Sequence, residues 1–251
     1  MLLGITETSQ ENQRVSILKK IKKVSAFFLV TMLLPIFIYI FFSTGIIKKK
    51  INSDIQEPVA KLVSSSGVGT AFLISPTILL TARHVVENNN VGDEVDLFFE
   101  QSKSKLNVKA KIKYISPTNF TSSGGQVPME YFLTDIAVLE VPEISEIVPL
   151  ELGESDEVNN LDEVILIGYP HGDYSITEGN INSKEFQGYD LFKLDAVSNP
   201  GNSGGPCILK SDNTVIGILV GGSGPLYQGE NVALKINVVK KILDEQHITY
   251  N

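Results

Sequence analysis

The sequence is poor in cysteine, histidine and tryptophan: its 251 residues include one Cys, three His and no Trp. With Cys207 alone, no internal disulfide can form, which excludes a disulfide-stabilised scaffold. Three scattered histidines and one cysteine lack the spacing of zinc ligands, so we expect no metal and no other cofactor. The remaining composition, 43% hydrophobic and 20% charged, excludes a disordered tail and a collagen-like repeat.

Basic residues are scarce beyond the first 50 positions. Residues 1–50 carry eight basic and two acidic side chains, a net charge of 8 − 2 = +6. Residues 51–251 carry 13 basic and 27 acidic side chains, a net charge of 13 − 27 = −14. Proteins bind nucleic acids mainly through lysine and arginine contacts to phosphates, so an acidic body argues against a nucleic-acid partner.

The sequence has one long hydrophobic run, Val24–Ile47, with 24 residues and no charge. About 20 apolar residues suffice to cross a bilayer as a helix, and membrane helices tolerate a proline such as Pro35. A buried core helix would show a polar stripe, and the run exceeds the roughly 7–15 residues of a signal-peptide core. We expect an uncleaved single-pass anchor in the lipid bilayer, with cleavage near Ser43-Thr44-Gly45 as the alternative.

Basic residues flank this run on both sides. Arg14 and four lysines between positions 19 and 23 precede it, and Lys48–Lys50 follow it. The slight excess on the N-terminal side favours a cytoplasmic N-terminus under the positive-inside rule. We therefore expect an extracytoplasmic body, with the body in the cytoplasm as the alternative.

The rest of the chain is expected to be a linker over 48–57 and a folded body over 58–251, after a short basic tail over 1–23. Leu106–Tyr114 alternates apolar and polar residues, as a half-buried strand does. Val238–Gln246 alone has helical spacing, and Ser116–Tyr131 predicts a long loop. No internal repeat is visible. Many short strands and almost no helix predict an all-β barrel or sandwich.

Further expected strands are separated by turn signals rich in Gly, Pro, Asn and Asp. The strands are Gly69–Ile74, Thr77–Leu80, Val95–Phe99, Ile136–Val141, Val164–Tyr169, Leu191–Leu194, Val215–Val220 and Val232–Ile236, and the turns include Ser75-Pro76, Ser123-Gly124-Gly125, Glu178-Gly179-Asn180 and Asp212-Asn213.

The segment Asn199–Cys207, NPGNSGGPC, is the strongest candidate for catalysis. A nucleophilic serine needs a sharp turn that exposes its hydroxyl, and the glycines around Ser203 permit such a turn. The N–H groups of Gly201 and Ser203 would then form an oxyanion hole. Taken alone, the segment is also compatible with a glycine-rich surface turn.

A nucleophilic serine also needs a base and a carboxylate. His84 follows an apolar run, where a strand ends and a short helix can begin, whereas His171 lies in a turn sequence and His247 in the C-terminal helix. Asp135 precedes an apolar strand, and a carboxylate there can fix the imidazole tautomer. Taken singly, His84 is also compatible with a structural histidine and Asp135 with a residue capping the preceding turn.

Together these segments resemble the signature blocks of trypsin-like serine proteases, most closely those of the HtrA/Deg branch. The order His, Asp, Ser along the chain agrees with that resemblance, which spans residues 58–246. It implies an all-β fold of two six-stranded barrels, about 58–141 and about 155–236, and a helix over about 238–246. The blocks are Gly69–Ile74, Thr81–Val86, Asp135–Leu139 and Asp195–Pro206.

The resemblance implies a role for each candidate residue. Ser203 would be the nucleophile, His84 the general base and then acid, and Asp135 the carboxylate that orients the imidazole. Gly201 and Ser203 would supply the oxyanion amides. Asp195, just before the serine loop, would be structural.

The same resemblance locates the first specificity pocket. Val197 would form its floor, and Val220, Gly221 and Gly222 its wall. No acid is present there to pair with an Arg or Lys side chain, and no His or Arg is evident for a Glu side chain. We expect cleavage after small or medium apolar residues such as Val, Ala or Leu.

Two features depart from the HtrA branch. The interval of 51 residues between His84 and Asp135 is longer than expected, and we attribute the surplus to the loop 116–131, which would gate the triad. The chain continues for 48 residues after Ser203, so we expect no PDZ domain in it.

The sequence thus predicts a membrane-anchored serine endopeptidase that cuts unfolded or membrane-proximal proteins. A catalytically silent scaffold that binds peptides, and the same protease facing the cytoplasm, are the alternatives. If the activity is controlled, loop ordering or assembly into a homo-oligomer would be the route.

Overall fold

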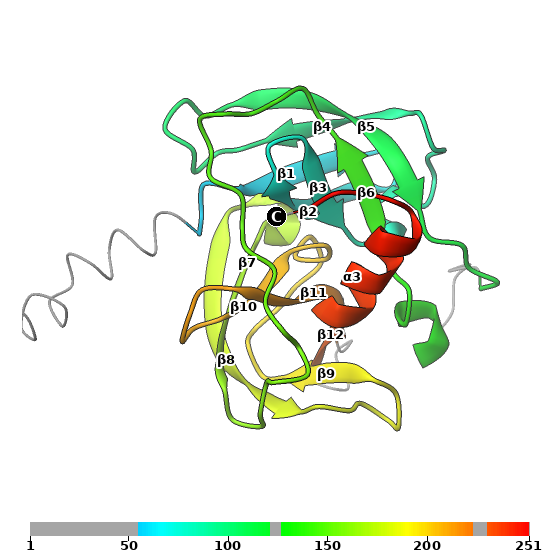
Figure 1. Cartoon of the computed structure of the whole chain (residues 1–251), viewed down its shortest axis with the longest axis vertical. Helices are drawn as coiled ribbons and strands as arrows, with labels where there is room; N and C mark the ends of the chain where they lie inside the picture. Colours follow the sequence, from blue (N-terminus) through cyan, green and yellow to red (C-terminus); the bar gives the residue numbers. More distant parts are fainter. Residues whose placement is uncertain (1–54, 121–126, 223–229, 251) are drawn as a thin grey trace, which may run out of the picture. The chain divides into compact units, whose positions relative to one another are not determined.

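The structure, a computed structural model, describes residues 55–120, 127–222 and 230–250, and strands are the main secondary structure in this part of the chain. Six of these strands close into one barrel and six into another (Figure 1). The expectation of an all-β fold with two six-stranded barrels is therefore confirmed. No helix within the described ranges is long and apolar enough to span a bilayer, and the expected anchor, 24–47, lies outside them.

The first barrel has the strand order β1-β2-β3-β6-β5-β4. The alternation seen in the sequence is realised in β5, where Ala110 and Ile112 are buried while Lys109 and Lys111 are exposed. The strands are β1 (Val59–Ser64), β2 (Gly67–Ser75), β3 (Ile78–Thr81), β4 (Glu94–Phe98), β5 (Asn107–Ile115) and β6 (Ala137–Glu140).

The second barrel repeats this connectivity as β7-β8-β9-β12-β11-β10, although the sequence shows no repeat. Helix α3 (Ile236–Glu245) follows β12 and packs against β11 and β12 through buried residues that include Val239 and Leu243. The strands are β7 (Glu163–Gly168), β8 (Ser175–Ser183), β9 (Leu191–Leu194), β10 (Pro206–Leu209), β11 (Val215–Gly222) and β12 (Asn231–Lys235).

One expected turn is wrong: Glu178-Gly179-Asn180 lies inside β8 and pairs with β7. The reason is packing, because a Cβ on Gly179 would lie 2.4 Å from the backbone nitrogen of Ala196. Glycine here permits a close approach between backbones and does not reverse the chain. The strands β1 and β8 were also not expected as strands. Pro206 occupies the first position of β10, which a strand tolerates.

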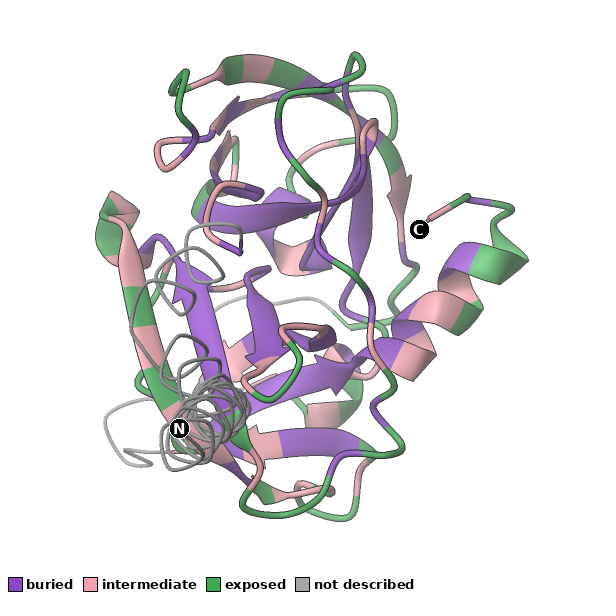
Figure 2. Ribbon diagram, turned by 60° about the vertical axis from the view of Figure 1, so that its left-hand side comes forward, coloured by how far each residue is buried: buried purple, intermediate pink, exposed green. Residues whose placement is uncertain are grey.

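The two barrels share a buried core. One apolar cluster contains residues of both barrels and of α3, whereas a smaller cluster lies within the second barrel. Figure 2 shows that most of the buried residues lie in the barrel strands, although β5 and β8 are largely intermediate or exposed, as are most of the connecting loops. Tyr169, directly after β7, is fully buried, and its hydroxyl donates a 3.4 Å hydrogen bond to the carbonyl of Val59 in the first barrel.

Candidate active site

His84 lies just beyond the end of β3, in the short helix η1 (Arg83–Val86). Its Nδ1 lies 2.6 Å from Oδ2 of Asp135, and its backbone N–H donates a 3.0 Å hydrogen bond to Oδ1 of the same carboxylate. The Asp135 side chain is fully buried, whereas that of His84 is 25% exposed. With a proton on Nδ1 held by Asp135, the Nε2 of His84 is left as the basic nitrogen.

The surroundings of His84 shift its pKa in both directions. Burial lowers the pKa, but the charge of Asp135 and its hydrogen bond to the imidazole outweigh burial, and Glu87 adds to their effect. The nearby charge of Arg83 acts in the opposite direction. The net result is a pKa of His84 raised above its ordinary value of 6.5.

Ser203 lies in a tight turn between the barrels. Gly201 and Gly204 on either side of it have positive φ angles of 105° and 83°. A Cβ on Gly204 would lie 2.2 Å from the carbonyl oxygen of Thr70 and 2.8 Å from the backbone nitrogen of Ala82. The serine turn therefore lies against the segment that leads into His84.

The amides of this turn are arranged as an oxyanion hole requires. The N–H groups of Gly201 and Ser203 donate to no acceptor among the described residues, while the neighbouring amides of Asn202 and Gly204 are hydrogen-bonded. The carbonyl of Pro200 accepts a 2.8 Å hydrogen bond from the N–H of His171. Because the C=O and N–H of a trans peptide point in opposite directions, the Gly201 N–H of the same peptide points away from His171.

The structure does not join all three expected residues of the triad by hydrogen bonds. Within residues 55–120, 127–222 and 230–250, no hydrogen bond links the Ser203 hydroxyl to His84 or to any other residue. Catalytic hydrogen bonds are often long in ligand-free enzymes and tighten when substrate binds. His84 and Asp135 are thus hydrogen-bonded to each other. The backbone of the serine turn, and not the Ser203 hydroxyl, lies against the segment that precedes His84.

Of the expected specificity residues, Val197 precedes the serine turn in sequence and the other three lie in β11. Val197 is 62% exposed, and its carbonyl accepts a 2.8 Å hydrogen bond from the Thr177 hydroxyl. Val220 is buried in β11, and a Cβ on Gly221 would lie 3.3 Å from the ring of Phe132. Gly222 ends β11. No sequence pattern pointed to Phe132, which follows the expected loop 116–131 and precedes Asp135 by three positions.

A second residue that sequence analysis missed stands behind the expected floor. Asn231 of β12 is buried, and its side-chain amide donates a 2.5 Å hydrogen bond to the carbonyl of Ala196. Asp195, expected to be structural, accepts a 2.6 Å hydrogen bond from the N–H of Asn180 and so ties the same segment to β8.

A third residue that sequence analysis missed is Arg83, which directly precedes His84. Its guanidinium is 3% exposed and donates a 2.8 Å hydrogen bond to the carbonyl of Tyr131 in helix η2 (Met129–Phe132). The Tyr131 hydroxyl lies 2.8 Å from Oε2 of Glu87. Burial, with the hydrogen bond to Glu87, raises the pKa of Tyr131 to about 12, so this hydroxyl remains a donor at neutral pH.

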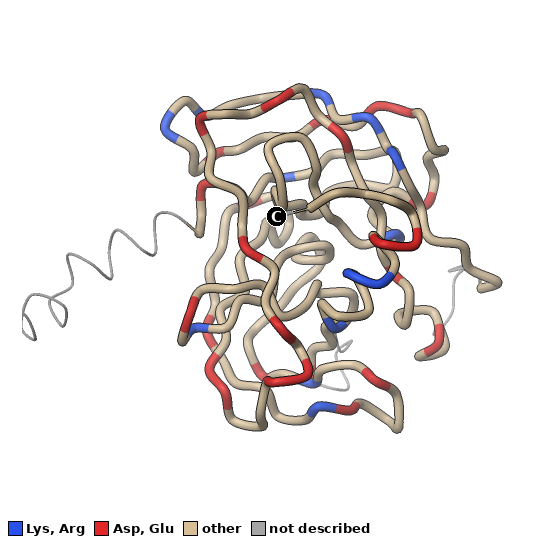
Figure 3. Tube along the Cα trace, viewed as in Figure 1, with Lys and Arg blue, Asp and Glu red and all other residues tan. Residues whose placement is uncertain are grey.

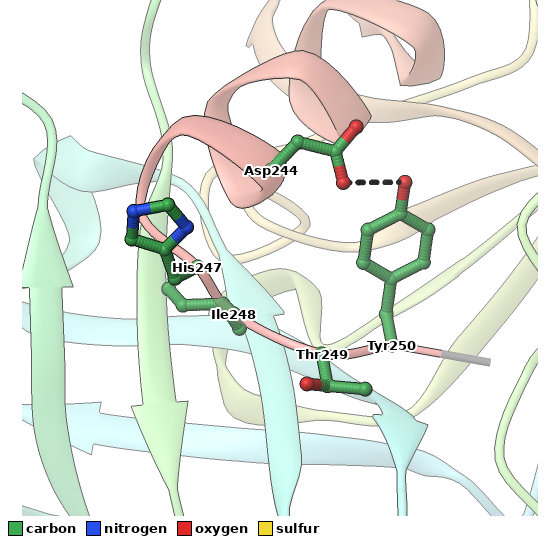
Figure 4. A pocket seen from close by; sticks show the side chains of 5 residues that line it. All are labelled: Asp244, His247, Ile248, Thr249 and Tyr250. Atoms are coloured by element: carbon green, nitrogen blue, oxygen red, sulfur yellow. Dashed lines mark hydrogen bonds between the residues drawn. The ribbon is translucent and has the colours of Figure 1, made fainter.

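The other histidines lie outside this group. His171 is exposed in the short helix η3 (Pro170–Gly172), and His247 is exposed just after α3. His247 lines a shallow hollow with Asp244, Ile248, Thr249 and Tyr250, none of which is an expected site residue (Figure 4). Among the described residues, no three His, Cys, Asp or Glu side chains gather as metal ligands would.

Comparison with known proteins identifies the family of this chain. The family model described as a trypsin-like peptidase domain matches residues 69–218. The chain is 34% identical over 154 residues to protease Do-like 4, mitochondrial, of Arabidopsis thaliana, which covers 56% of this chain and 25% of that protein. It is 30% identical over 190 residues to a probable periplasmic serine endoprotease, DegP-like, of Chlamydia pneumoniae, covering 70% of this chain and 34% of that protein.

Solved structures show the same fold at lower identity. The HtrA-type protease AlgW with a decapeptide superposes with a TM-score of 0.61 and 21% identity, over 78% of this chain and 66% of that one. The Rv3671c protease in an inactive form gives a TM-score of 0.59 and 21% identity, over 81% and 95%. This chain spans about a quarter to a third of the two curated relatives above. On the family match and the fold together, the chain belongs to the trypsin-like serine peptidases and has relatives of the HtrA/DegP type.

Proposed function

We propose that this chain is a membrane-anchored serine endopeptidase that hydrolyses peptide bonds with His84, Asp135 and Ser203. The contact between the His84 imidazole and the buried Asp135 carboxylate carries the proposal. A buried carboxylate at 2.6 Å from Nδ1, together with a serine turn in which the N–H groups of Gly201 and Ser203 have no acceptor among the described residues, is an arrangement suited to acyl transfer.

Acylation would begin with attack of the Ser203 Oγ on the carbonyl carbon of the scissile bond. As the O–C bond forms, the hydroxyl proton passes to Nε2 of His84, and Asp135 stabilises the resulting imidazolium. The negative charge that develops on the carbonyl oxygen is met by the N–H groups of Gly201 and Ser203. His84 then returns the proton to the leaving nitrogen as the C–N bond breaks.

Deacylation would reverse the roles with water as the nucleophile. His84 takes a proton from water as its oxygen attacks the acyl carbon, and the same two amides stabilise the second tetrahedral intermediate. The ester bond to Ser203 then breaks, and His84 gives its proton to the Oγ. The free enzyme and a new carboxyl terminus are the products.

The substrates we propose are unfolded or membrane-proximal proteins cut after small or medium apolar residues. Val197 offers an exposed apolar side chain at the expected floor, and Val220 and Gly221 bring no charge to the expected wall. Acidic residues are distributed over both barrels (Figure 3), which disfavours a nucleic-acid partner. The solved structure of the HtrA-type protease AlgW with a decapeptide supports a peptide as the ligand.

We propose that Val24–Ile47 anchors the chain and that the barrels face the extracytoplasmic side. The uncharged run and its basic flank support this orientation, and a relative described as periplasmic agrees with it. Added protease should digest the barrels in spheroplasts but not in intact cells, if they lie outside the cytoplasmic membrane. Protection in both preparations would place them in the cytoplasm instead.

Digestion of an unfolded test protein by the purified full chain in mild detergent tests the activity. Removing the nucleophile with Ser203→Ala should lower the rate by roughly 10⁴–10⁶-fold. The matched control is Ser104→Ala, which changes an exposed serine bonded to Glu146 and should leave the rate unchanged. Equal cleavage by wild type and Ser203→Ala would refute the assignment.

A catalytically silent scaffold is the competing proposal, and the missing hydrogen bond between Ser203 and His84 is the observation that favours it. A fluorophosphonate reacts only with an activated serine, so it separates the two proposals. Labelling of wild type but not of Ser203→Ala supports the enzyme. A wild-type chain that binds peptides but neither labels nor cleaves supports the scaffold.

A further inference from the structure

Thr70, near the start of β2, joins the first barrel to the serine turn through its hydroxyl and its backbone N–H. Its side chain is fully buried. Its hydroxyl donates a 2.7 Å hydrogen bond to the carbonyl of Gly201 and accepts a 3.1 Å one from the N–H of Tyr169. Its own N–H donates to the carbonyl of Ser203 at 2.9 Å, and its carbonyl accepts from the Thr81 hydroxyl at 2.7 Å.

These contacts fix the two peptide groups on either side of Gly201. The carbonyl of Pro200 is held from the second barrel by the N–H of His171, and the carbonyl of Gly201 is held from the first barrel by Thr70. Because a peptide group is planar, holding the Pro200 carbonyl sets the direction of the Gly201 N–H. Holding the Gly201 carbonyl sets the peptide that follows, so the conformation of Gly201 at φ 105° is determined from both sides.

Glycine has no side chain to restrain its own backbone, so external bonds must supply the restraint. A Cβ on Gly201 would lie 2.2 Å from the carbonyl oxygen of Tyr169, which excludes any larger residue here. Gly201 therefore has a flexible backbone of its own, yet its N–H must be placed accurately if it is to stabilise an oxyanion. Thr70 is the described residue that meets this demand from the opposite barrel.

We propose that Thr70 is a positioning residue for catalysis: its buried hydroxyl holds the oxyanion amide of Gly201 in place across the interface between the two barrels. This inference rests on the proposed function, because it assumes that Gly201 stabilises an oxyanion. It adds that formation of the oxyanion hole is coupled to docking of the barrels, since the hydroxyl comes from one barrel and the amide from the other.

Replacement of Thr70 by valine tests the hydroxyl with little change in shape. In Thr70→Val, the Gly201 carbonyl and the Tyr169 N–H both lose their partner, while the backbone bond to Ser203 remains. We expect kcat on a peptide substrate to fall by about ten- to a hundredfold with little change in KM, a smaller loss than the roughly 10²–10³-fold of deleting an oxyanion donor. Thr70→Ser keeps the hydroxyl and should restore most of kcat.

Two further measurements on the full chain distinguish a positioning role of Thr70 in catalysis from a role in stability alone. Ser155→Ala removes another buried hydroxyl, one that accepts from the N–H of Asn237 at the start of α3, and should lower the melting temperature without changing kcat of the folded protein. Hydrogen exchange of the peptide 199–205 should accelerate in Thr70→Val and stay unchanged in Ser155→Ala.

The outcomes distinguish this inference from the proposed function. A selective loss of kcat in Thr70→Val, restored in Thr70→Ser, supports the inference. An active wild type with an unchanged kcat in Thr70→Val overturns the inference alone. A wild type that neither cleaves nor reacts with a fluorophosphonate overturns the proposed function, and the positioning role for catalysis falls with it.

Discussion

The guanidinium of Arg83 lies 4.3 Å over the ring of Tyr131 and 3.9 Å from Oδ1 of Asp135. Oδ1 also accepts the backbone N–H of His84, so the other oxygen, Oδ2, is left for the imidazole. A buried cation thus stands beside the catalytic carboxylate proposed here, on the residue directly before the proposed base. This neighbour affects how the site responds to pH.

The first prediction concerns the pH dependence of the wild type. The base must be neutral to take the proton of Ser203, and the pKa of His84 is raised above 6.5. Activity should therefore increase as pH rises through a midpoint above 6.5. The measurement is kcat/KM against pH, which reports ionisations of the free enzyme. A midpoint at or below 6.5 would contradict the proposed balance between burial and Asp135.

The second prediction is that Arg83→Met shifts this midpoint to a higher pH. The charge of Arg83 lowers the pKa of His84, so its removal should raise that pKa further. Arg83→Lys keeps a cation and should shift the midpoint less. Because the buried Asp135 carboxylate loses its neighbouring cation and the carbonyl of Tyr131 loses its donor, we also expect Arg83→Met to destabilise the fold by about 3 kcal/mol.

Lys103→Met is the control for charge alone, because Lys103 is exposed and has no hydrogen bond or ion pair with the described residues of the site. It should change neither the melting temperature nor the pH profile by a measurable amount. An unshifted profile in Arg83→Met, together with the loss of stability, would restrict Arg83 to a structural role.

The third prediction distinguishes Asp135, the proposed catalytic carboxylate, from Asp195, which precedes the serine turn in sequence. Asp135→Asn should lower kcat by about 10⁴-fold, because an amide favours the wrong tautomer of the imidazole. Asp195→Asn should leave kcat within a fewfold of wild type, since among the described residues this carboxylate accepts a hydrogen bond from the N–H of Asn180 and none from the proposed catalytic residues. Comparable losses in both variants would call the assignment of Asp135 into question.

Local patterns in the sequence predicted much of this fold. The alternation in 106–114 appears as β5, and the run 191–194 is β9 with the same bounds. The errors have a common cause in close packing between distant segments. Gly179 marks a crossing of β8 over Ala196 and not a turn, and no local pattern reveals which glycines face another backbone.

The same contrast applies to the candidate site: sequence motifs identified some of its residues, whereas the roles of others depend on packing between distant segments. His84, Asp135 and Ser203 could be named because they lie in recognisable blocks of sequence. Arg83 and Thr70 lie inside those same blocks, but their roles depend on contacts with residues 48 and 131 positions away. Such contacts follow from barrel closure and docking, which neither hydrophobic periodicity nor residue spacing encodes.

The fourth prediction uses two glycines with the same backbone angle. Gly188 and Gly204 both have φ 83°, but a Cβ would meet nothing within 4 Å at Gly188 and the Thr70 carbonyl at 2.2 Å at Gly204. Gly188→Ala should cost only backbone strain, roughly 1–2 kcal/mol of the free energy of unfolding. Gly204→Ala should cost at least about twice that and abolish cleavage, because the serine turn must move.

Thermal or denaturant unfolding of the two variants measures this difference. Equal destabilisation by both substitutions would mean that the close approach of the turn to β2 is relieved at no cost. The docking of Ser203 on the first barrel, on which the proposed site depends, would then be less tight than these distances indicate.

The last prediction tests the expected floor of the specificity pocket. Val197→Asp should create cleavage after Arg or Lys, because a carboxylate at an exposed floor position can pair with a cationic side chain. We expect kcat/KM for an Arg substrate to rise by at least about tenfold, equivalent to 1.4 kcal/mol, and that for a Val substrate to fall. Val197→Asn, which is similar in size but neutral, should lower the Val rate without the gain for Arg. If Val197→Asp leaves the preference unchanged, the substrate side chain is read elsewhere, and Phe132 beside Gly221 is the next position to vary.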